Sequence, residues 1–580
     1  MNTSVAQRKM WKVNPRAETL SLPPSLHPVI GQLLWQRGIR TDQEAERFFS
    51  PDFGRDTHDP FLFRHMDRAV DRIFQALRND ERITIHGDYD ADGVTGSAVL
   101  TVTLREILRA MGKSIETLDF YVPHREREGY GVHEATVRLL AEAGTRLMIT
   151  VDCGIACAEA VAEAKRLGID TIVTDHHEFP SQLPEAILIH PKLPGETYPF
   201  PHLAAVGVAW KLACALFDQG RKLGFDVSPA AEKWLLDLVA IATVTDVVPL
   251  VGENRALEFF GLKVLRKTKR LGLQKLYAVA GIRAETIDTW KVGFQIGPRI
   301  NAAGRMEHAE AAFRLLVTDD EQEAEALAAK LQEQNSNRQQ ESNRMFEEAR
   351  RQIIERQDAA LLWACGETWS AGLVGLVAGK LAQEFGKPVL VMGRVGDRWV
   401  GSGRSIPGFH ITEALGEAAD CLDRFGGHPQ ACGFSTFTDE RFSRFLRKMD
   451  EVAARQLAAL TLAPLLTVDV ELAWGEATLA LAEEIERMRP FGEANPEPKF
   501  LTRQLTVVGL DAVGEGKHLR LLLKSREGVA QKGIAFGWGL RQEKPALGNI
   551  IDLVYELGVH RWNGFSEAQC KLVDFRDTET

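Results

Sequence analysis

The chain has 580 residues, a formal net charge of −10, and 45% hydrophobic and 26% charged residues, a composition typical of globular protein but too long for one core. No apolar run approaches the roughly 18 to 20 residues of a membrane helix, and the N-terminal residues lack the apolar core of a signal peptide. The seven scattered cysteines favour free thiols over a disulfide framework or a structural zinc site, so we expect three or four domains and a cytoplasmic location.

The first part of the chain predicts a helical segment followed by a parallel α/β domain. Residues 1–50 have a helical pattern broken by prolines, and we assign residues 51–317 to the next domain. There the apolar segments "RITIHGD", "RLMITVD" and "DTIVTDHH" alternate with helical segments, which is typical of a parallel sheet. Residues 231–248 fit a buried helix or a helix–strand edge.

One local tract runs against the acidic net charge. The sequence "LKVLRKTKRLG", residues 262–272, contains five basic residues and no acidic one. It fits a solvated helix face or a local basic groove, and an acidic net charge argues only weakly against nucleic-acid binding.

The second half predicts a long helix between further domains. Residues 318–357 lack Gly and Pro and are rich in Glu, Gln, Arg and Ala, which indicates one rigid connecting helix or, alternatively, a helical hairpin. Residues 358–458 return to a strand–helix–strand pattern, a second α/β domain. Residues 459–580 contain short alternating segments with turn signals, typical of a small β-barrel. The predicted fold class is therefore multidomain α/β with a C-terminal barrel.

Ligand-type side chains gather where the predicted strands end. The stretch "ITIHGDYDADGVTGS", residues 83–97, carries one histidine and three aspartates directly after a β-branched run, and the next two strands end in Asp152 and in Asp175, His176 and His177. A single Asp after a strand is usually a helix cap, but three such strand ends exceed what capping requires. Because ligand sites of parallel sheets lie at the carboxyl ends of the strands, we expect these groups to converge, together with Asp246 after a further apolar stretch.

The chemistry of this set points to divalent ions. Carboxylate and imidazole suit Mn²⁺ or Mg²⁺, and the set contains enough ligands for two ions. A pair of ions clamps the attacking and leaving oxygens of a displacement at phosphorus and lowers the pKa of a bound water. The sequence therefore predicts a metal site for phosphoester hydrolysis.

The motifs resemble those of a known family. "HGDYDADG", "VDCG" and "DHH" are similar to the successive motifs of the DHH phosphoesterases, and the resemblance continues in "PRINAAGR", "GSGRS", "GGHPQACGF" and "RPFGEANPEPKF". In this order the series resembles the RecJ family of single-strand-specific 5′→3′ DNA exonucleases, from about residue 50 to the C-terminus. The resemblance implies hydrolysis of single-stranded DNA to mononucleotides in recombinational and mismatch repair, by a monomer that works with a RecQ-type helicase and a single-strand-binding protein.

The resemblance also implies roles for single residues. His86 and Asp90 would hold one metal, Asp92, His176 and Asp246 would hold the other, and Asp152 would bridge both. Asp88 would be a neighbour of the ligands. His177 would face the scissile phosphate, and Asp175 would orient a ligand histidine.

A further group is expected to bind the substrate. Glycine-rich loops can cradle phosphate with their N–H groups, and arginine can fork onto its oxygens, although each loop alone is more often an ordinary turn. The residues of this group are Arg125, Arg299, Asn301, Arg305, Ser402, Arg404, Gly426, Gly427 and His428. In the C-terminal module, which resembles an OB-fold, the candidates for stacking on bases or, alternatively, for packing in the core are Phe491, Phe536, Trp538, Trp562 and Phe565.

Two other functions remain compatible with the pattern. A two-lobed DHH phosphodiesterase would cleave oligoribonucleotides or other small phosphoesters, but would not need the C-terminal module. A non-catalytic scaffold that binds DNA or a replication partner would be expected to have lost metal ligands, and this chain retains them all.

Overall fold

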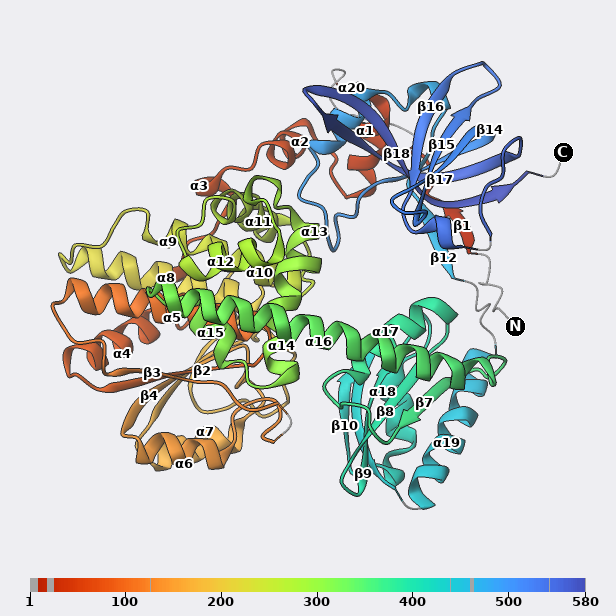
Figure 1. Cartoon of the computed structure of the whole chain (residues 1–580). Coiled ribbons are helices and arrows are strands. Elements are labelled where there is room, and N and C mark those ends of the chain that lie inside the picture. Colours follow the sequence, from red (N-terminus) through yellow and green to blue (C-terminus); the bar gives the residue numbers. More distant parts are fainter. Residues whose placement is uncertain are drawn as a thin grey trace. The chain divides into compact units, whose positions relative to one another are not determined.

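The computed structural model describes residues 9–17, 26–125, 127–438, 440–458, 464–541 and 543–578 (Figure 1). The chain forms two compact units, which are described separately. One contains His58–Val248 and Phe260–Pro464, and the other contains Lys9–Thr57, Pro249–Phe259 and Leu465–Thr580. In the described part of the chain, no helix combines the length and the apolar character needed to cross a bilayer. All seven cysteines are free, as predicted.

The first unit begins with the predicted parallel sheet, whose strand order is β3-β2-β4-β5-β6. All four strand pairs are parallel; β2 pairs with β4 from Ile83↔Leu147, and β4 pairs with β5 from Leu147↔Asp170. The strands are β2 (Arg82–Gly87), β3 (Leu118–Tyr121), β4 (Thr145–Val151), β5 (Asp170–Thr174) and β6 (Ile187–Ile189). Their inner residues are buried, as expected for a sheet covered on both faces.

Helices cover both faces of this sheet (Figure 1). Helices α6 (Glu134–Glu142) and α7 (Ala158–Arg166) pack on one face, and α4 (Met66–Arg78), α5 (Ala91–Ala110) and α8 (Ala205–Lys222) pack on the other. Helix α5 follows β2 directly, so its N-terminus lies at the carboxyl edge of the sheet. Nearly every residue of its first half is buried.

A helical region follows the sheet. The ambiguous residues 231–248 form helices rather than a strand, because the segment is apolar on all sides and buried. The helices are α9 (Ala231–Trp234), α10 (Leu236–Thr245), α11 (Gly252–Leu265), α12 (Leu271–Ala280), α13 (Thr289–Lys291), α14 (Gly297–Met306) and α15 (Glu310–Val317), with a π-helical turn at Val292–Ile296.

The predicted connecting helix is a single helix, α16, over Glu321–Ile354. Its 34 residues span about 50 Å at 1.5 Å per residue. It packs on α12, α14 and α15 near its start and on α17 (Val374–Phe385) and β7 (Leu362–Gly366) near its end. The alternative of a helical hairpin is thereby excluded.

The second α/β domain has a mixed sheet of order β10-β11-β9-β8-β7, in which only β7 and β8 are parallel. Strands β9 (Arg398–Arg404) and β10 (Arg424–His428) carry the two glycine-rich motifs, and β10 is an exposed edge strand. The remaining elements are β8 (Val389–Val395), α18 (Ile411–Glu417), β11 (Ala431–Phe437) and α19 (Glu440–Leu457).

The second unit contains the predicted barrel. Strand β14 pairs with both β15 and β17, which closes the five strands β14-β15-β16-β18-β17 into a ring. The elements of this unit are β12 (Leu465–Val468), β13 (Val470–Glu471), α20 (Leu479–Glu486), β14 (Lys499–Val513), β15 (His518–Lys524), β16 (Ala530–Ala535), β17 (Ile550–Trp562) and β18 (Phe565–Asp577).

The N-terminal segment corrects one prediction. Helices are found at α1 (Pro28–Gln36), α2 (Asp42–Phe49) and α3 (Phe53–Asp56), but Met10–Val13 forms a strand, β1, that pairs in parallel with β12. Residues 1–8 and 18–25 lie outside the described residues. The buried side chains of α1 share a core with the barrel. A pairing partner more than 450 residues away leaves no local pattern, which is why the prediction of helix failed here.

Candidate active site

The first motif loop is held by its own carboxylates. Asp90 caps α5, since its Oδ1 accepts hydrogen bonds from the backbone N–H groups of Asp92 (2.9 Å) and Gly93 (3.2 Å). A Cβ on Gly93 would lie 2.5 Å from the nitrogen of Asp88, so only glycine allows the helix to start this close to the loop. The amide oxygen of Asn301 accepts from the N–H of Ala91 at 2.8 Å and fixes the same turn from α14.

Asp92 is anchored between two helix N-termini. It lies in the first turn of α5, and its two oxygens accept from the first N–H groups of α8, those of Ala205 (2.7 Å) and Val206 (2.8 Å). Each oxygen keeps a further lone pair for another partner.

Two further aspartates lie at or next to a residue with a positive φ. Asp152, directly after β4, has a φ of 62°, and Val247, directly after Asp246 at the end of α10, has a φ of 58°. A positive φ is tolerated by Asp but is an outlier for a β-branched residue. Such outliers persist only where the surrounding structure enforces them, commonly at functional sites. Both turns present a carboxylate toward the same place.

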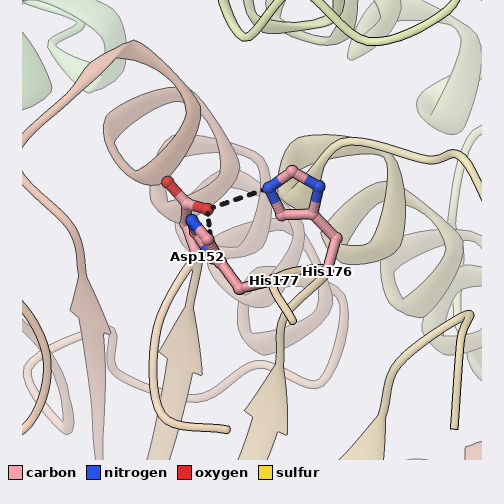
Figure 2. A group of neighbouring side chains, drawn as sticks. All are labelled: Asp152, His176 and His177. Atoms are coloured by element: carbon pink, nitrogen blue, oxygen red, sulfur yellow. Dashed lines mark ion pairs between the residues drawn. The ribbon is translucent and has the colours of Figure 1, made fainter. Parts of the chain in front are cut away.

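These side chains converge around His176, and Figure 2 shows Asp152 beside His176 and His177. The Nε2 of His176 lies 3.4 Å from Asp152 Oδ1, 3.7 Å from Asp92 Oδ2 and 3.5 Å from Asp246 Oδ2. Neighbouring ligands of an octahedral ion with bonds near 2.1 Å are about 3 Å apart, so the spacing suits ligands around a cation better than direct hydrogen bonds. In the described residues, two further compact groups of ligand atoms share Asp152, which fits a bridging position.

One of those groups differs from the expected ligand set. It contains Asp88 with Asp90 and Asp152, where the resemblance implied His86 with Asp90. His86 is fully buried, with Nδ1 3.7 Å from the Cys153 sulfur. Its Nε2 has no hydrogen-bond partner among the described residues, which is compatible with a ligand role. Its metal role stays a prediction, and Asp88 becomes a second candidate for the same ion.

The electrostatics of the cluster favour a bound cation. Burial, together with the charges of neighbouring aspartates, raises the pKa of Asp92 to about 7 and that of Asp246 to about 9, and drives that of Asp152 well above its ordinary value. Burial lowers the pKa of His86 to about 4 and that of His176 to about 3. Imidazoles that stay neutral can bind a metal ion through nitrogen, and a divalent ion would offset the repulsion among the carboxylates and favour their ionised form.

Unpartnered atoms support the same conclusion. Among the buried side-chain atoms of the described residues that have no hydrogen-bond partner are Asp88 Oδ1, Asp152 Oδ1 and His176 Nε2. Buried polar atoms are nearly always satisfied, and these three belong to the groups of converging ligand atoms. The residues present therefore fit divalent metal ions.

The side chain of Asp175 contacts His177, and its expected role of orienting a metal-ligating histidine stays a prediction. Its Oδ1 lies 2.9 Å from His177 Nδ1 and also accepts from the backbone N–H of His176 at 2.8 Å. Burial opposes ionisation of Asp175, but the hydrogen bond and charge of His177 outweigh it, and the pKa of Asp175 falls to about 2. The pKa of His177 is raised by the same contact, against the effect of burial.

A tyrosine that the sequence analysis missed, Tyr130, contacts both Asp152 and His177. The hydroxyl of Tyr130 donates to the carbonyl oxygen of Asp152 at 3.0 Å and lies 3.1 Å from His177 Nδ1. The rings of Tyr130 and His177 meet edge to face. Its only sequence signal is the pair of flanking glycines in "EGYGV".

Several predicted substrate-binding arginines form one cationic group. Arg305, on α14, is partly buried, and its pKa falls to about 10 through desolvation and through the charges of Arg125, Arg338 and Arg404. The same residue interacts with Asp90, which lies in the metal cluster. Arg338, from the connecting helix, is a member that the sequence analysis missed, because nothing distinguishes it from the other charged residues of α16. Like charges this close call for an anion.

The other predicted residues are more dispersed. Ser402 Oγ donates to the Cys432 carbonyl and accepts from Arg404 at 2.8 Å, so these two side chains form a pair on β9. Arg299 donates to Gln332 on α16 and reaches the cationic group only through the charge of Arg338. Gly426, Gly427 and His428 are exposed on β10, and Gly427 has a φ of 140°.

The barrel unit separates the aromatic candidates. Phe491 and Trp538 are buried in the core. Phe536, Trp562 and Phe565 are 57%, 69% and 81% exposed, and the last two face each other across the tip of the β17–β18 hairpin. Only these three are available for stacking.

Comparison with known families identifies three regions of the chain. Residues 82–243 match the N-terminal domain of the DHH family, residues 358–455 match the DHHA1 domain, and residues 468–574 match the RecJ OB domain.

Relatives match over nearly the whole chain. The single-stranded-DNA-specific exonuclease RecJ of Dickeya dadantii is 36% identical over 96% of this chain and 97% of its own length, and that of Bacillus subtilis is 37% identical over 98% and 71%. The crystal structure of RecJ from Thermus thermophilus in complex with Mn²⁺ superimposes with a TM-score of 0.80 at 30% identity, covering 98% of this chain and 80% of that one. A second structure of that protein, in complex with Mg²⁺, gives a TM-score of 0.74.

Proposed function

The chain belongs to the RecJ family of single-stranded-DNA-specific exonucleases, and from that premise we propose that it degrades single-stranded DNA in the 5′→3′ direction to mononucleotides at the cluster around Asp152 and His176. It is a metal-dependent phosphodiester hydrolase that uses Mn²⁺ or Mg²⁺. The observation that carries the assignment of the site is the convergence of buried, partly unsatisfied carboxylates and imidazoles from three strand ends and α10 beside a group of arginines.

The ligand set of the two ions follows from the geometry and the resemblance together. Asp92, His176 and Asp246 would hold one ion, Asp90 with His86 or Asp88 would hold the other, and Asp152 would contact both. When bound, two such ions activate a water and stabilise the charge that develops on the attacking and leaving oxygens.

His177 is the group best arranged to move a proton. A carboxylate only accepts hydrogen bonds, so the contact with Asp175 keeps the proton of the imidazole on Nδ1 and leaves Nε2 for the substrate. The contact also raises the pKa of His177, which favours a protonated ring able to donate to phosphate oxygen. The hydroxyl of Tyr130 lies 3.1 Å from the same nitrogen, Nδ1, and also contacts this edge of the ring.

The arginines supply the grip on the strand. Arg125, Arg305 and Arg404 come from three separate elements and act on one another through their charges, so a phosphate among them would relieve their repulsion. One guanidinium group can donate two parallel hydrogen bonds to the oxygens of a phosphate. A terminal phosphate held here, beside Asp90, would place the first diester near the ions and would give the enzyme its 5′ polarity.

The barrel extends the contact along the strand. OB-folds bind single strands by stacking bases on aromatic rings, and the hairpin tip of Trp562 and Phe565 is exposed. This module argues against the small-substrate alternative, which would gain nothing from it.

The cellular setting is part of the proposal. Action in recombinational and mismatch repair, together with a RecQ-type helicase and a single-strand-binding protein, follows from the family. A cytoplasmic location agrees with the seven free thiols, and we expect the enzyme to act as a monomer.

The decisive experiment offers four substrates with Mn²⁺: a single strand labelled at its 5′ end, the same strand labelled at its 3′ end, a blunt duplex and a dinucleotide. Immediate release of labelled mononucleotide from the 5′-labelled strand, with the 3′ label retained in long products, is the expected result. Preferential cleavage of the dinucleotide would favour the small-phosphoester alternative, and reversed label release would overturn the polarity.

A further inference from the structure

A second cationic site lies in the first unit, away from the metal ligands. A cavity of about 210 Å³ opens between the C-terminal half of α5, the start of α10, the segment before α12 and the end of α15. Helix α5 packs on α10 and α15, and α15 packs on α12. One wall is the end of the basic tract of residues 262–272, which the proposed activity leaves unexplained.

The cavity and the metal ligands are at opposite ends of the same helix. Asp92 lies in the first turn of α5 and Arg105 lies 13 residues later, which corresponds to about 20 Å along the axis. A ligand of nucleotide size in the cavity could not touch the metal ligands, so the cavity is a separate site.

The lining carries an excess of positive charge. It contains four cationic side chains, those of Arg105, Arg109, Lys269 and Arg270, against the carboxylates of Asp237 and Asp319. Asp319 makes a long contact of 3.5 Å with Arg109 between exposed side chains, which neutralises little, and its charge also acts on Arg105.

Asp237 does not neutralise the other cationic side chains, because its oxygens already accept hydrogen bonds from other groups. It is buried, accepts from Thr268 Oγ1 at 2.7 Å and from its neighbour Leu238 N–H at 2.8 Å, and binds Arg270 Nε at 3.0 Å. This contact fixes the guanidinium of Arg270 at the cavity wall and accounts for only one of the four cations.

Arg105 faces the remaining charges at close range. It is half-buried and donates from one nitrogen to the carbonyl of Val317 at 3.0 Å. Burial lowers its pKa, the charge of Asp319 opposes this effect, and the charge of Arg109 adds a smaller lowering. An anion in the cavity could accept hydrogen bonds from the guanidinium groups of Arg105 and Arg109.

The cavity also offers an aromatic wall and a helix N-terminus. Trp234 is 38% exposed, and Lys269 Nζ lies 4.0 Å from its ring centroid. Helix α12 begins at Leu271 in the lining, and its N-cap residue Arg270 provides no side-chain cap. The first N–H groups of the helix therefore add to the attraction for an anion.

We propose that this cavity binds the phosphate group of a 5′-mononucleotide, with the base against Trp234. Its volume is below the range of roughly 300 to 1,000 Å³ that is usual for drug-sized ligands, which favours a phosphate and sugar within and a base at the rim. A mononucleotide is also the class of molecule that the exonuclease reaction releases, so the site would let the enzyme respond to its product. The site itself is argued from the cavity alone and goes beyond the proposed function.

The test uses two matched double variants of the full-length, Mn²⁺-loaded chain. Arg109→Gln with Lys269→Gln removes two exposed cations of the cavity. Arg266→Gln with Lys267→Gln removes the same charge from positions of the same tract outside the lining. Equilibrium dialysis measures the binding of labelled dAMP, of inorganic phosphate and of a single-stranded oligonucleotide with phosphorothioate linkages, which resist hydrolysis. Binding at the metal site is common to all variants and does not contribute to their difference.

The expected result is a dissociation constant for dAMP that rises by about tenfold or more in the cavity variant and stays unchanged in the control, since charge-assisted hydrogen bonds to phosphate are lost. In addition, Trp234→Ala should weaken dAMP and leave inorganic phosphate unaffected. Equal dAMP affinity in both double variants would overturn the proposal. So would a loss confined to the oligonucleotide, which would make the cavity part of a DNA track.

Discussion

Replacing Asp152 by Asn should remove hydrolysis and preserve the fold. Asparagine keeps the shape of the side chain and tolerates the left-handed conformation of this residue (φ 62°). The backbone bonds of residue 152 to Thr174 and Tyr130 are also retained. What disappears is one negative charge at the centre of the cluster.

The magnitude follows from the distances. Asp152 Oδ1 lies 3.4 Å from His176 Nε2 and 3.6 Å from His177 Nδ1, so its charge acts within about 4 Å of whatever these groups hold. At an effective dielectric constant near 20, a pair of unit charges at that distance contributes roughly 4 kcal/mol. We therefore expect the affinity for a metal ion to fall by about 10³-fold and turnover at moderate Mn²⁺ to be lost.

The assay combines calorimetric Mn²⁺ titration, hydrolysis of a labelled single strand and strand binding by fluorescence anisotropy. Asp80→Asn is the matched control, because Asp80 is exposed and has a φ of 54° but lies outside the site. Strand binding should remain measurable in both variants. Two Mn²⁺ ions bound with unchanged affinity, or near-normal turnover, in the Asp152→Asn protein would refute the bridging role.

Four further outcomes are expected. Asp175→Asn should lower kcat much more than it lowers Mn²⁺ affinity, measured by titration, since it frees the ring beside it and removes no ligand of the ions. Trp562→Ala with Phe565→Ala should reduce the binding free energy of long strands, measured by anisotropy, by roughly 1 to 3 kcal/mol per lost stack. Cleavage of a pentanucleotide should be unchanged. A duplex with a 5′ single-stranded tail should be cleaved only along the tail, whereas efficient blunt-end digestion would contradict single-strand specificity. Because the pKa values of Asp92 (about 7) and Asp246 (about 9) lie above their unfolded values, the folded metal-free chain binds more protons than the unfolded chain. Its Tm in a chelator should therefore fall as pH rises from about 5 to 9, and Mn²⁺ should restore it most at the alkaline end.

The sequence located the site because its ligands lie where local patterns are clearest. His86, Asp152 and the Asp175–His177 triplet all follow apolar strands, and strand direction alone brings such ends to one edge of a sheet. The long helix could also be predicted, because about forty residues without Gly or Pro strongly favour a helix.

The features of the fold and the site that the sequence did not predict depend on contacts between distant elements. The strand at Met10–Val13 exists only through β12. Whether an aromatic residue of the barrel lies in the core or on the surface depends on the direction that the pleat and the turns give its side chain. Trp538 is therefore buried, whereas Phe536, two positions earlier, is exposed. Arg338 acquires its charged neighbours Arg299 and Arg305 from α14, and the side chain of Asp175 contacts the ring of His177 within a single turn.

The segregation of charge explains how an acidic chain can handle DNA. The net charge of −10 is a property of the whole surface, whereas a strand meets only the groups beside the site. There the carboxylates of the metal cluster lie next to Arg305, which interacts with Asp90 on one side and with three arginines on the other. With metal bound, both halves of this arrangement attract phosphate. Without metal, any ionised carboxylate of the cluster opposes the arginines. Strand affinity should then depend on divalent ions as well as on salt, and the metal dependence should fade in a variant that lacks a carboxylate of the cluster, whereas the salt dependence, which reports counterion release by the arginines, should persist.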